Sequence, residues 1–247
     1  MDILYVIGQG SKHDNLELRW SLRSISKYGA NVGNVIVAGF PPDWLSEKVI
    51  KIPVRDKYSY KHSNILRCIE EVVDNNIVAG DFLYSSDDHF YVKQTDFDHY
   101  PYYIKSLHLR TSVPLGDRYK KYHTSLKDTG ELLRRHNLPD ANYAQHANTH
   151  MNADVINEYR NLIYESYAMP YGAEPTSLLM NAWQTKPNAP SCEYRQDIKI
   201  SMVENLRDFL TRIGQRECFS VGDGIFEHKH IMQYLKNLYS EKSPYEK

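Results

Sequence analysis

The chain has 247 residues, a length that fits one large domain. Its hydrophobic fraction of 41% and charged fraction of 25% are ordinary for a globular protein. A formal net charge of -1 excludes a general electrostatic attraction to nucleic acid or to anionic membranes, so a polyanion would need a local patch.

No targeting or membrane segment is expected. No apolar run approaches the roughly 20 residues that span a bilayer, and residues 1–5 lack the basic and long apolar regions of a signal peptide. The cysteines are three, an odd number, and lie far apart, which argues against a disulfide framework and fits a reducing compartment. We therefore expect a cytoplasmic protein in which Cys68, Cys192 and Cys218 are free thiols.

The first ninety residues alternate between strand and helix patterns. An apolar run at residues 3–7 predicts a buried strand, and residues 8–11 predict a tight loop that glycine permits. A helix is expected over residues 14–28, where apolar residues recur at i, i+4 and i+7. The other elements predicted here are strands at residues 35–38, 49–54 and 82–84 and a helix at 64–73.

This order of elements predicts an α/β fold. Strand, helix, strand, strand, helix, strand favours an open and mostly parallel sheet, in which ligands collect at the carboxyl ends of the strands. Residues 8–11 and 85–89 both follow predicted strands. We therefore expect these two segments to share one edge of the sheet.

The second part of the chain has weaker patterns. Residues 91–148 are rich in Tyr, His, Asp and Lys, and we expect irregular structure there apart from a short helix at 131–136. Further helices are predicted at residues 154–167, 176–183, 202–213 and 230–239. The segment contains a modest basic stretch that would suit phosphates, although such a stretch is more often a solvated surface: Lys105, Arg110, Arg118, Lys120 and Lys121.

An acidic turn, Ser86-Asp87-Asp88-His89, interrupts an apolar stretch that continues on both sides. Buried carboxylates without a partner are unfavourable, whereas Mg²⁺ or Mn²⁺ would neutralise them and accept diphosphate oxygens as further ligands. The alternative is an acidic turn of a hairpin with no ligand.

Other polar residues could complete such a site. Arg19 and Arg23 are four apart on one helix face and could bind a diphosphate, or could be surface or structural ion-pair residues. His146 and His150 are also four apart, but the residues between them do not predict a helix, so zinc is not expected. Asp223 lies between two glycines, in a turn that could approach a ligand or simply start a helix.

Several motifs resemble the Stealth family of sugar-phosphate transferases and related small bacterial and phage glycosyltransferase-like proteins. Residues 2–5 (DILY) lead to a Gly-Ser loop, as the family's D-x-V-Y strand does, and residues 17–24 (ELRWSLRS) are similar to E-L-R-Y-S-L-R-S. Residues 35–38 (VIVA) and 42–45 (PDWL) are similar to I-x-I-V and P-x-W-L. Residues 82–90 (FLYSSDDHF) are similar to F-x-Y-x-N-D-D-x-F, with Ser86 in place of the asparagine. A weaker similarity places His146 and Asp223 on polar positions of the family, although the proline of an H-x-P segment is absent.

The resemblance implies a single nucleotide-diphosphosugar transferase domain of the GT-A-like, Rossmann-like type over residues 1–247, with a helical C-terminal part. Residues 1–92 would bind nucleotide sugar and metal, and residues 93–247 would face the acceptor. The residues expected at the site are Gly8, Gly10, Ser11, Arg19, Arg23 and Asn64 for the nucleotide sugar, Asp87 and Asp88 for Mn²⁺ or Mg²⁺, and His146, Asp223 and Asp88 for catalysis.

The expected function is therefore metal-dependent transfer of a sugar from a nucleotide sugar, with a UDP-sugar as the expected donor. Sugar-1-phosphate transfer of the Stealth type uses the same site, and a non-catalytic binding or interaction protein is a further alternative. The sequence leaves the acceptor open among a glycan, a lipid-linked sugar, a small molecule and modified nucleic acid. It also leaves the oligomeric state open.

Overall fold

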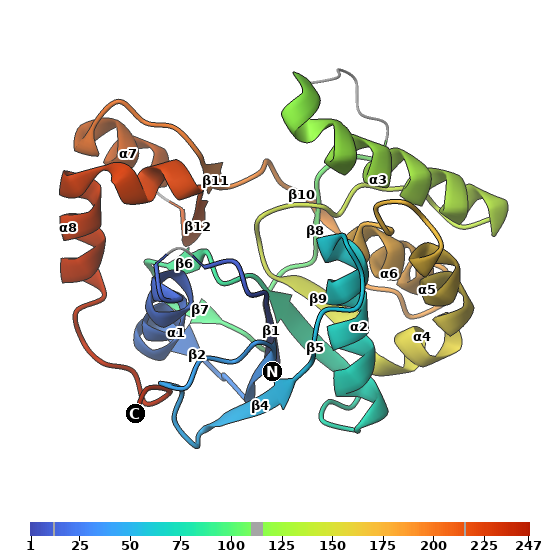
Figure 1. The fold of residues 1–247 in the computed structure, drawn as a ribbon, viewed down its shortest axis with the longest axis horizontal. Helices are drawn as coiled ribbons and strands as arrows, with labels where there is room; N and C mark the ends of the chain where they lie inside the picture. Colours follow the sequence, from blue (N-terminus) through green and yellow to red (C-terminus); the bar gives the residue numbers. More distant parts are fainter. Residues whose placement is uncertain (12, 110–115, 215) are drawn as a thin grey trace.

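The structure, a computed structural model, describes residues 1–11, 13–109, 116–214 and 216–247. For residues 116–119 it describes the backbone alone. A five-stranded sheet lies at its centre in the order β4-β3-β1-β5-β9, and only the edge strand β9 is antiparallel (Figure 1). The mixed α/β prediction is thus confirmed. The strands are β1 (Asp2–Ile7), β3 (Val35–Gly39), β4 (Val49–Pro53), β5 (Asp81–Ser85) and β9 (Thr149–Asn152).

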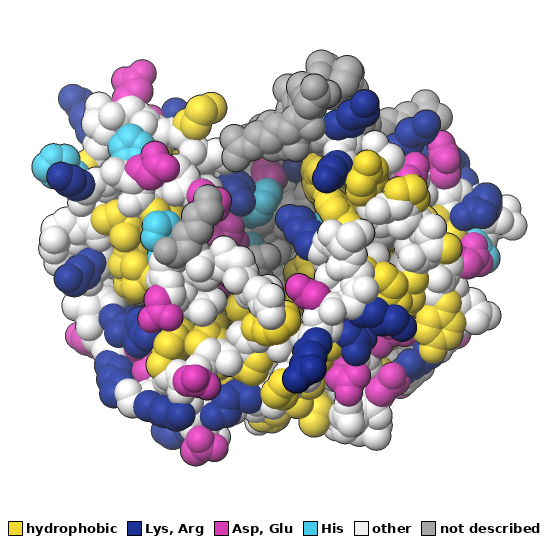
Figure 2. Space-filling model, in the orientation of Figure 1, with side chains coloured by type: hydrophobic (Ala, Val, Ile, Leu, Met, Phe, Trp, Pro, Cys, Tyr) yellow, Lys and Arg dark blue, Asp and Glu magenta, His cyan; other side chains and the backbone are white. Residues whose placement is uncertain are grey.

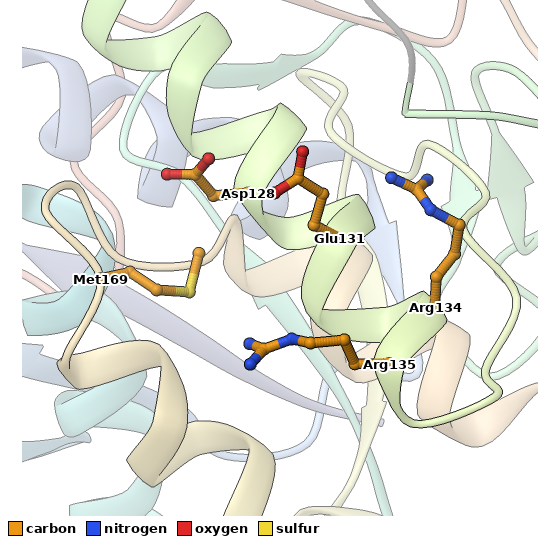
Figure 3. Close-up of a pocket in the computed structure, with 5 residues that line it drawn as sticks. All are labelled: Asp128, Glu131, Arg134, Arg135 and Met169. Carbon is orange, nitrogen blue, oxygen red and sulfur yellow. The ribbon is translucent and has the colours of Figure 1, made fainter.

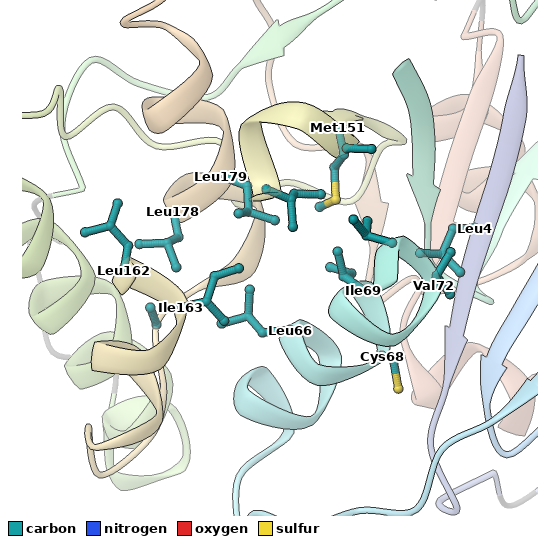
Figure 4. Close-up of a cluster of buried hydrophobic side chains, with 14 of the residues drawn as sticks. Leu4, Leu66, Cys68, Ile69, Val72, Met151, Leu162, Ile163, Leu178 and Leu179 are labelled. Atoms are coloured by element: carbon teal, nitrogen blue, oxygen red, sulfur yellow. The ribbon is translucent and has the colours of Figure 1, made fainter. Parts of the chain in front are cut away.

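Two helices cover opposite faces of this sheet. Alternate residues of a strand point to opposite faces, so Ile3 and Tyr5 pack in one buried cluster with α1 (Leu16–Tyr28). Leu4 lies in the other cluster, with α2 (Lys61–Asp74), as Figure 4 shows. Burying apolar side chains on both faces fixes the register of β1.

The strand order places a switch point beside β1. The chain runs from β1 to β3 and β4 on one side, and returns through α2 to β5 on the other side of β1. Ligands bind at the carboxyl ends of strands where the order reverses in this way. The two predicted segments lie there: residues 8–11 follow β1, and residues 85–89 run from the last residue of β5 to the first residue of β6.

A second, three-stranded sheet packs on the α1 side of the molecule (Figure 1). Strand β12 pairs in parallel with β11 and antiparallel with β6, which places Ser220 opposite His89. This pairing brings the segment after β12 to the acidic turn. The elements of this part are β6 (His89–Tyr91), β11 (Lys199–Ile200), α7 (Leu206–Ile213), β12 (Cys218–Val221), η1 (Asp223–Glu227) and α8 (Lys229–Leu238).

Helices α3 to α6 pack on the α2 side of the molecule (Figure 1). They are α3 (Gly116–Arg135), α4 (Ala153–Glu158), α5 (Arg160–Tyr167) and α6 (Pro175–Trp183). Two short strand pairs complete the fold: β2 (Gly29–Ala30) with β7 (Thr95–Asp96), and β8 (Tyr103–Ile104) with β10 (Glu193–Tyr194).

Three element predictions were wrong. The helix expected at 131–136 is the 20-residue α3, whose buried face includes the polar Ser125 and Thr129, so its apolar periodicity is weak. The helix expected at 154–167 is two helices that meet at Tyr159. The helix expected at 202–213 begins only after Asn205, whose side chain accepts the backbone N–H of Asp208.

The three cysteines are free thiols, as predicted, with Cys68 and Cys218 buried. Within the described ranges, no helix has the length and apolar character needed to cross a membrane.

A buried ion pair joins Glu246, near the end of the described chain, to α1. The Glu246 side chain is 1% exposed and accepts hydrogen bonds from Arg19 Nη1 at 2.8 Å and Arg23 Nε at 2.7 Å. The backbone N–H of Ser243 donates to the same carboxylate. Burial opposes its ionisation, but the hydrogen bonds from Arg23, Ser243 and Arg19 outweigh burial and lower the pKa of Glu246 to about 2.

We expect Glu246→Gln to lower the free energy of unfolding by about 2–4 kcal/mol at pH 7, because it leaves two arginines without their shared carboxylate. A depressed pKa contributes stability above the ordinary value of 4.5, and this contribution is lost as the pH falls toward about 2. Urea unfolding should show the difference between the two proteins shrinking over that range, with the exposed Glu241→Gln as a neutral control. A difference that is constant from pH 7 to pH 2.5 would contradict this account.

Candidate functional site

A pocket of about 510 Å³ lies at the switch point between β1 and β5. On the face shown in Figure 2 the molecule is hollowed between its two sides, and acidic, basic and histidine side chains gather there. Six of the predicted site residues line this pocket together: Gly8, Gly10, Ser11, Asp87, Asp88 and Asp223. The other lining residues are His13, Asn15, Glu17, Lys61, Val221 and Phe226.

The glycines of the first loop leave space rather than make a turn. Neither Gly8 nor Gly10 has a positive φ, and a Cβ at either position would meet no atom within 4 Å. The left-handed residues are instead Asp14 and Asn15, just before α1, so the predicted reason for the glycines was wrong. Their missing side chains keep the pocket open beside Ser11.

The two adjacent carboxylates have different surroundings. Asp88 Oδ2 accepts a hydrogen bond from Ser220 Oγ at 2.9 Å and one from Lys199 Nζ at 3.3 Å. Burial alone would raise the pKa of Asp88, but the charges of Lys199, His89 and His146 and the Ser220 hydroxyl outweigh it and lower the pKa. Asp88 is therefore a stable anion.

Asp87 carries the opposite shift. Burial, followed by the negative charges of Asp88 and Glu17, raises its pKa to about 7. Its ionised form is poorly compensated by the protein itself. A bound cation would supply the missing positive charge.

His89 lies behind the turn as a buried residue. Its Nδ1 is 3.1 Å from Asn148 Oδ1, and burial lowers its pKa below the ordinary histidine value. Its Nε2 has no hydrogen-bond partner and lies 3.9 Å from Asp88 Oδ1.

His146 lies near this turn and is held by a carboxylate from another segment. Its Nδ1 is 3.0 Å from Asp197 Oδ1, and Lys105 Nζ donates to Asp197 Oδ2 at 2.9 Å. The His146 side chain remains 38% exposed. It lies close enough to Asp88 for its charge to help lower the pKa of that residue.

Four of the predicted residues lie outside the pocket lining: Arg19, Arg23, Asn64 and His146. Arg19 and Arg23 are paired with Glu246, and Arg19 also lies over the Trp44 ring at 4.1 Å from its centroid. Asn64 accepts the backbone N–H groups of residues 57 and 58 and holds that loop. A diphosphate would have to displace Glu246 to reach the two arginines.

The structure brings in residues that the sequence analysis did not single out. Lys61, the first residue of α2, lines the pocket. Lys199 and Ser220 donate hydrogen bonds to Asp88, and Asp197 contacts the ring of His146. These are isolated polar residues without a motif. Glu17 also lines the pocket, and it differs from them because it lies in the ELRWSLRS motif, from which the sequence could have indicated it.

The carboxylate oxygens of Asp87 and Asp88 are the type of ligand that a hard divalent cation prefers. Mg²⁺ is commonly held by one or two protein carboxylates together with substrate phosphates and water. Within the part of the chain that the structure describes, no group of three or more His, Cys, Asp and Glu side chains could hold a metal alone. The phosphates of a ligand would have to complete the coordination.

Three residues of the predicted basic stretch have described side chains. Lys105 is paired with Asp197, and Lys120 and Lys121 are exposed on α3. Arg110 and the side chain of Arg118 lie outside the described residues.

A second surface hollow, of about 650 Å³, lies along α3 (Figure 3). Its acids, Asp128 and Glu131, are mixed with Arg134 and Arg135, and Arg134 is already paired with Asp140. No single charge or convergent set of polar groups marks this hollow as a binding site.

No family model matches the chain, and no curated protein matches it. Among solved structures, the chain is similar to a glycosyltransferase involved in the glycosylation of the major capsid of PBCV-1. The similarity covers 98% of this chain and 100% of that chain, with 8% sequence identity and a TM-score of 0.40.

The opposite shifts of Asp87 and Asp88 predict opposite effects of the same substitution. A raised pKa destabilises the fold increasingly as pH rises from the ordinary value of 3.8 toward about 7, so Asp87→Asn should stabilise the metal-free protein at pH 8. After allowance for solvent screening at this half-buried site, we expect a gain of about 1–2 kcal/mol, or roughly 2–8 °C in Tm.

Asp88→Asn is the matched control, because a lowered pKa contributes stability above the ordinary value. It should lower Tm at pH 8, since Lys199 then loses its anion. Thermal unfolding in EDTA between pH 4 and pH 8 measures both variants. Equal effects of the two substitutions would refute the assigned difference.

Proposed function

We propose that this protein is a metal-dependent glycosyltransferase that uses a nucleotide-sugar donor, with a UDP-sugar as the expected donor. The observation that carries the proposal is the convergence of the Gly8–Ser11 loop and the Asp87-Asp88 pair in one pocket at the switch point of the sheet. This is where an open α/β sheet binds nucleotides.

The pocket supports distinct roles for its residues. The open space over Gly8 and Gly10 accommodates the nucleotide, and Asp87 and Asp88 hold Mn²⁺ or Mg²⁺ against the diphosphate. When bound, the cation would act as a Lewis acid on the leaving diphosphate.

The positive charge for the diphosphate comes from Lys61 in this proposal, and not from Arg19 or Arg23. Lys61 lines the pocket at the first turn of α2, where the helix dipole also favours an anion. His146 is the candidate general base for an acceptor hydroxyl, because its ring is partly exposed beside Asp88. Asp223, an exposed residue of the pocket lining, is the substitute base.

The proposal predicts donor binding that depends on a metal. In a thermal-shift screen of UDP-, GDP-, ADP- and dTDP-sugars, one donor should raise Tm in the presence of Mn²⁺ and not in EDTA. Asp88→Ala should abolish this shift, whereas Asp43→Ala, at an exposed loop position, should retain it. If a donor stabilises both variants equally, the proposal that Asp88 binds the diphosphate through a metal ion is wrong.

Product analysis with the same donor identifies the bond that breaks. Release of the nucleoside diphosphate supports glycosyl transfer, and release of the monophosphate indicates sugar-1-phosphate transfer instead. If no nucleotide sugar is consumed or bound with metal, the chain is a binding or interaction protein and the proposal fails.

Lys61→Met should raise the Kd of the donor by about tenfold, because one charge-assisted contact with phosphate is lost. Lys48→Met, at an exposed position outside the pocket lining, is the control for loss of charge alone. Isothermal titration with the donor at fixed Mn²⁺ measures both. If the Lys61 variant binds the donor with unchanged affinity, Lys61 does not bind the diphosphate and the assignment is wrong.

A further inference from the structure

We infer that Asp197 is the positioning residue of the site: it fixes the orientation and tautomer of His146 so that the Nε2 of this ring is the free base. The inference rests on the proposed function, because a base is needed only if an acceptor hydroxyl must lose a proton. The geometry of the pair itself is independent of the substrate.

The carboxylate of Asp197 is held by groups from three segments. Lys105 Nζ donates to Oδ2 at 2.9 Å, and the backbone N–H of Lys199 donates to Oδ1 at 3.1 Å. His146 approaches with its Nδ1 at 3.0 and 3.1 Å from the two oxygens, and its own backbone N–H lies 3.4 Å from Oδ1. Ring and carboxylate are therefore fixed relative to each other by side-chain and backbone contacts.

An ionised carboxylate can only accept hydrogen bonds. Burial opposes ionisation of Asp197, but His146 and Lys105 outweigh it and hold its pKa well below the usual range. Nδ1 of His146 must therefore carry the proton in this contact, which leaves the lone pair of a neutral ring on Nε2. The ring is 38% exposed, so a hydroxyl can reach it.

The same carboxylate also connects the base to the acidic turn. It binds the backbone N–H of Lys199, whose Nζ donates to Asp88 Oδ2 at 3.3 Å. One residue thus places both the base and the lysine that compensates Asp88. In a catalytic step, the acceptor O–H proton would pass to His146 Nε2 while the oxygen attacks the anomeric carbon of the donor. The bond from that carbon to the diphosphate oxygen would break, the nucleoside diphosphate would leave with the electron pair, and Asp197 would stabilise the imidazolium formed.

The test is the tautomer of His146, measured without substrate. Long-range ¹H–¹⁵N NMR at pH 9, well above the ordinary histidine pKa of about 6.5, distinguishes the two neutral forms, and His146→Gln assigns the signal. Wild type should show the Nδ1–H form. Asp197→Asn should lose this preference, while Lys105→Met, which leaves the His146 contact in place, should keep it.

Turnover adds a second readout. With the donor identified by the thermal-shift screen, Asp197→Asn should lower kcat by at least about tenfold and leave the donor KM within about twofold. An Nε2–H tautomer in wild type, an unchanged tautomer in Asp197→Asn, or a loss of donor binding that accounts for the whole effect would overturn the inference. If wild type consumes no nucleotide sugar, the proposed function fails, while the tautomer still decides whether Asp197 orients the ring.

Discussion

Strand β1 is hydrogen-bonded in parallel to β3 on one side and to β5 on the other, and its side chains are buried on both faces. This double pairing leaves little freedom in register, because a shift of one residue would exchange Ile3 and Leu4 between two differently packed faces. The loops after β1 and β5 must then emerge side by side. The position of the pocket follows directly from this constraint.

The chemistry of the pocket follows from an unequal division of positive charge. Lys199 and Ser220 from the second sheet donate hydrogen bonds to Asp88. At Asp87, burial and the negative charges of Asp88 and Glu17 outweigh the smaller effect of Lys199. An arrangement that destabilises one carboxylate in the absence of a ligand is typical of sites in which the ligand supplies the compensation. This is the physical reason to connect the acidic turn with a cation and a diphosphate.

The two arginines of α1 lie where their spacing predicts, but they bind a carboxylate of the protein and do not line the pocket. Arg19 and Arg23 do share one helix face, as their spacing predicts, but that face meets Glu246 rather than the pocket. The two arginines hold residues after α8 against α1, since Glu246 binds both of them and the Tyr239 carbonyl accepts from Arg23.

The sequence by itself determined the strands and helices around β1, the glycine loop and the acidic turn, because local apolar periodicity and chain order are sufficient for these. It did not determine the partners of the site. Lys199 and Ser220 lie more than a hundred residues from Asp88 in the chain, and Asp197 lies about fifty from His146. Single polar residues at such separations leave no periodic signal, and only the pairing of β12 with β6 and the packing of the two sides of the molecule bring them together.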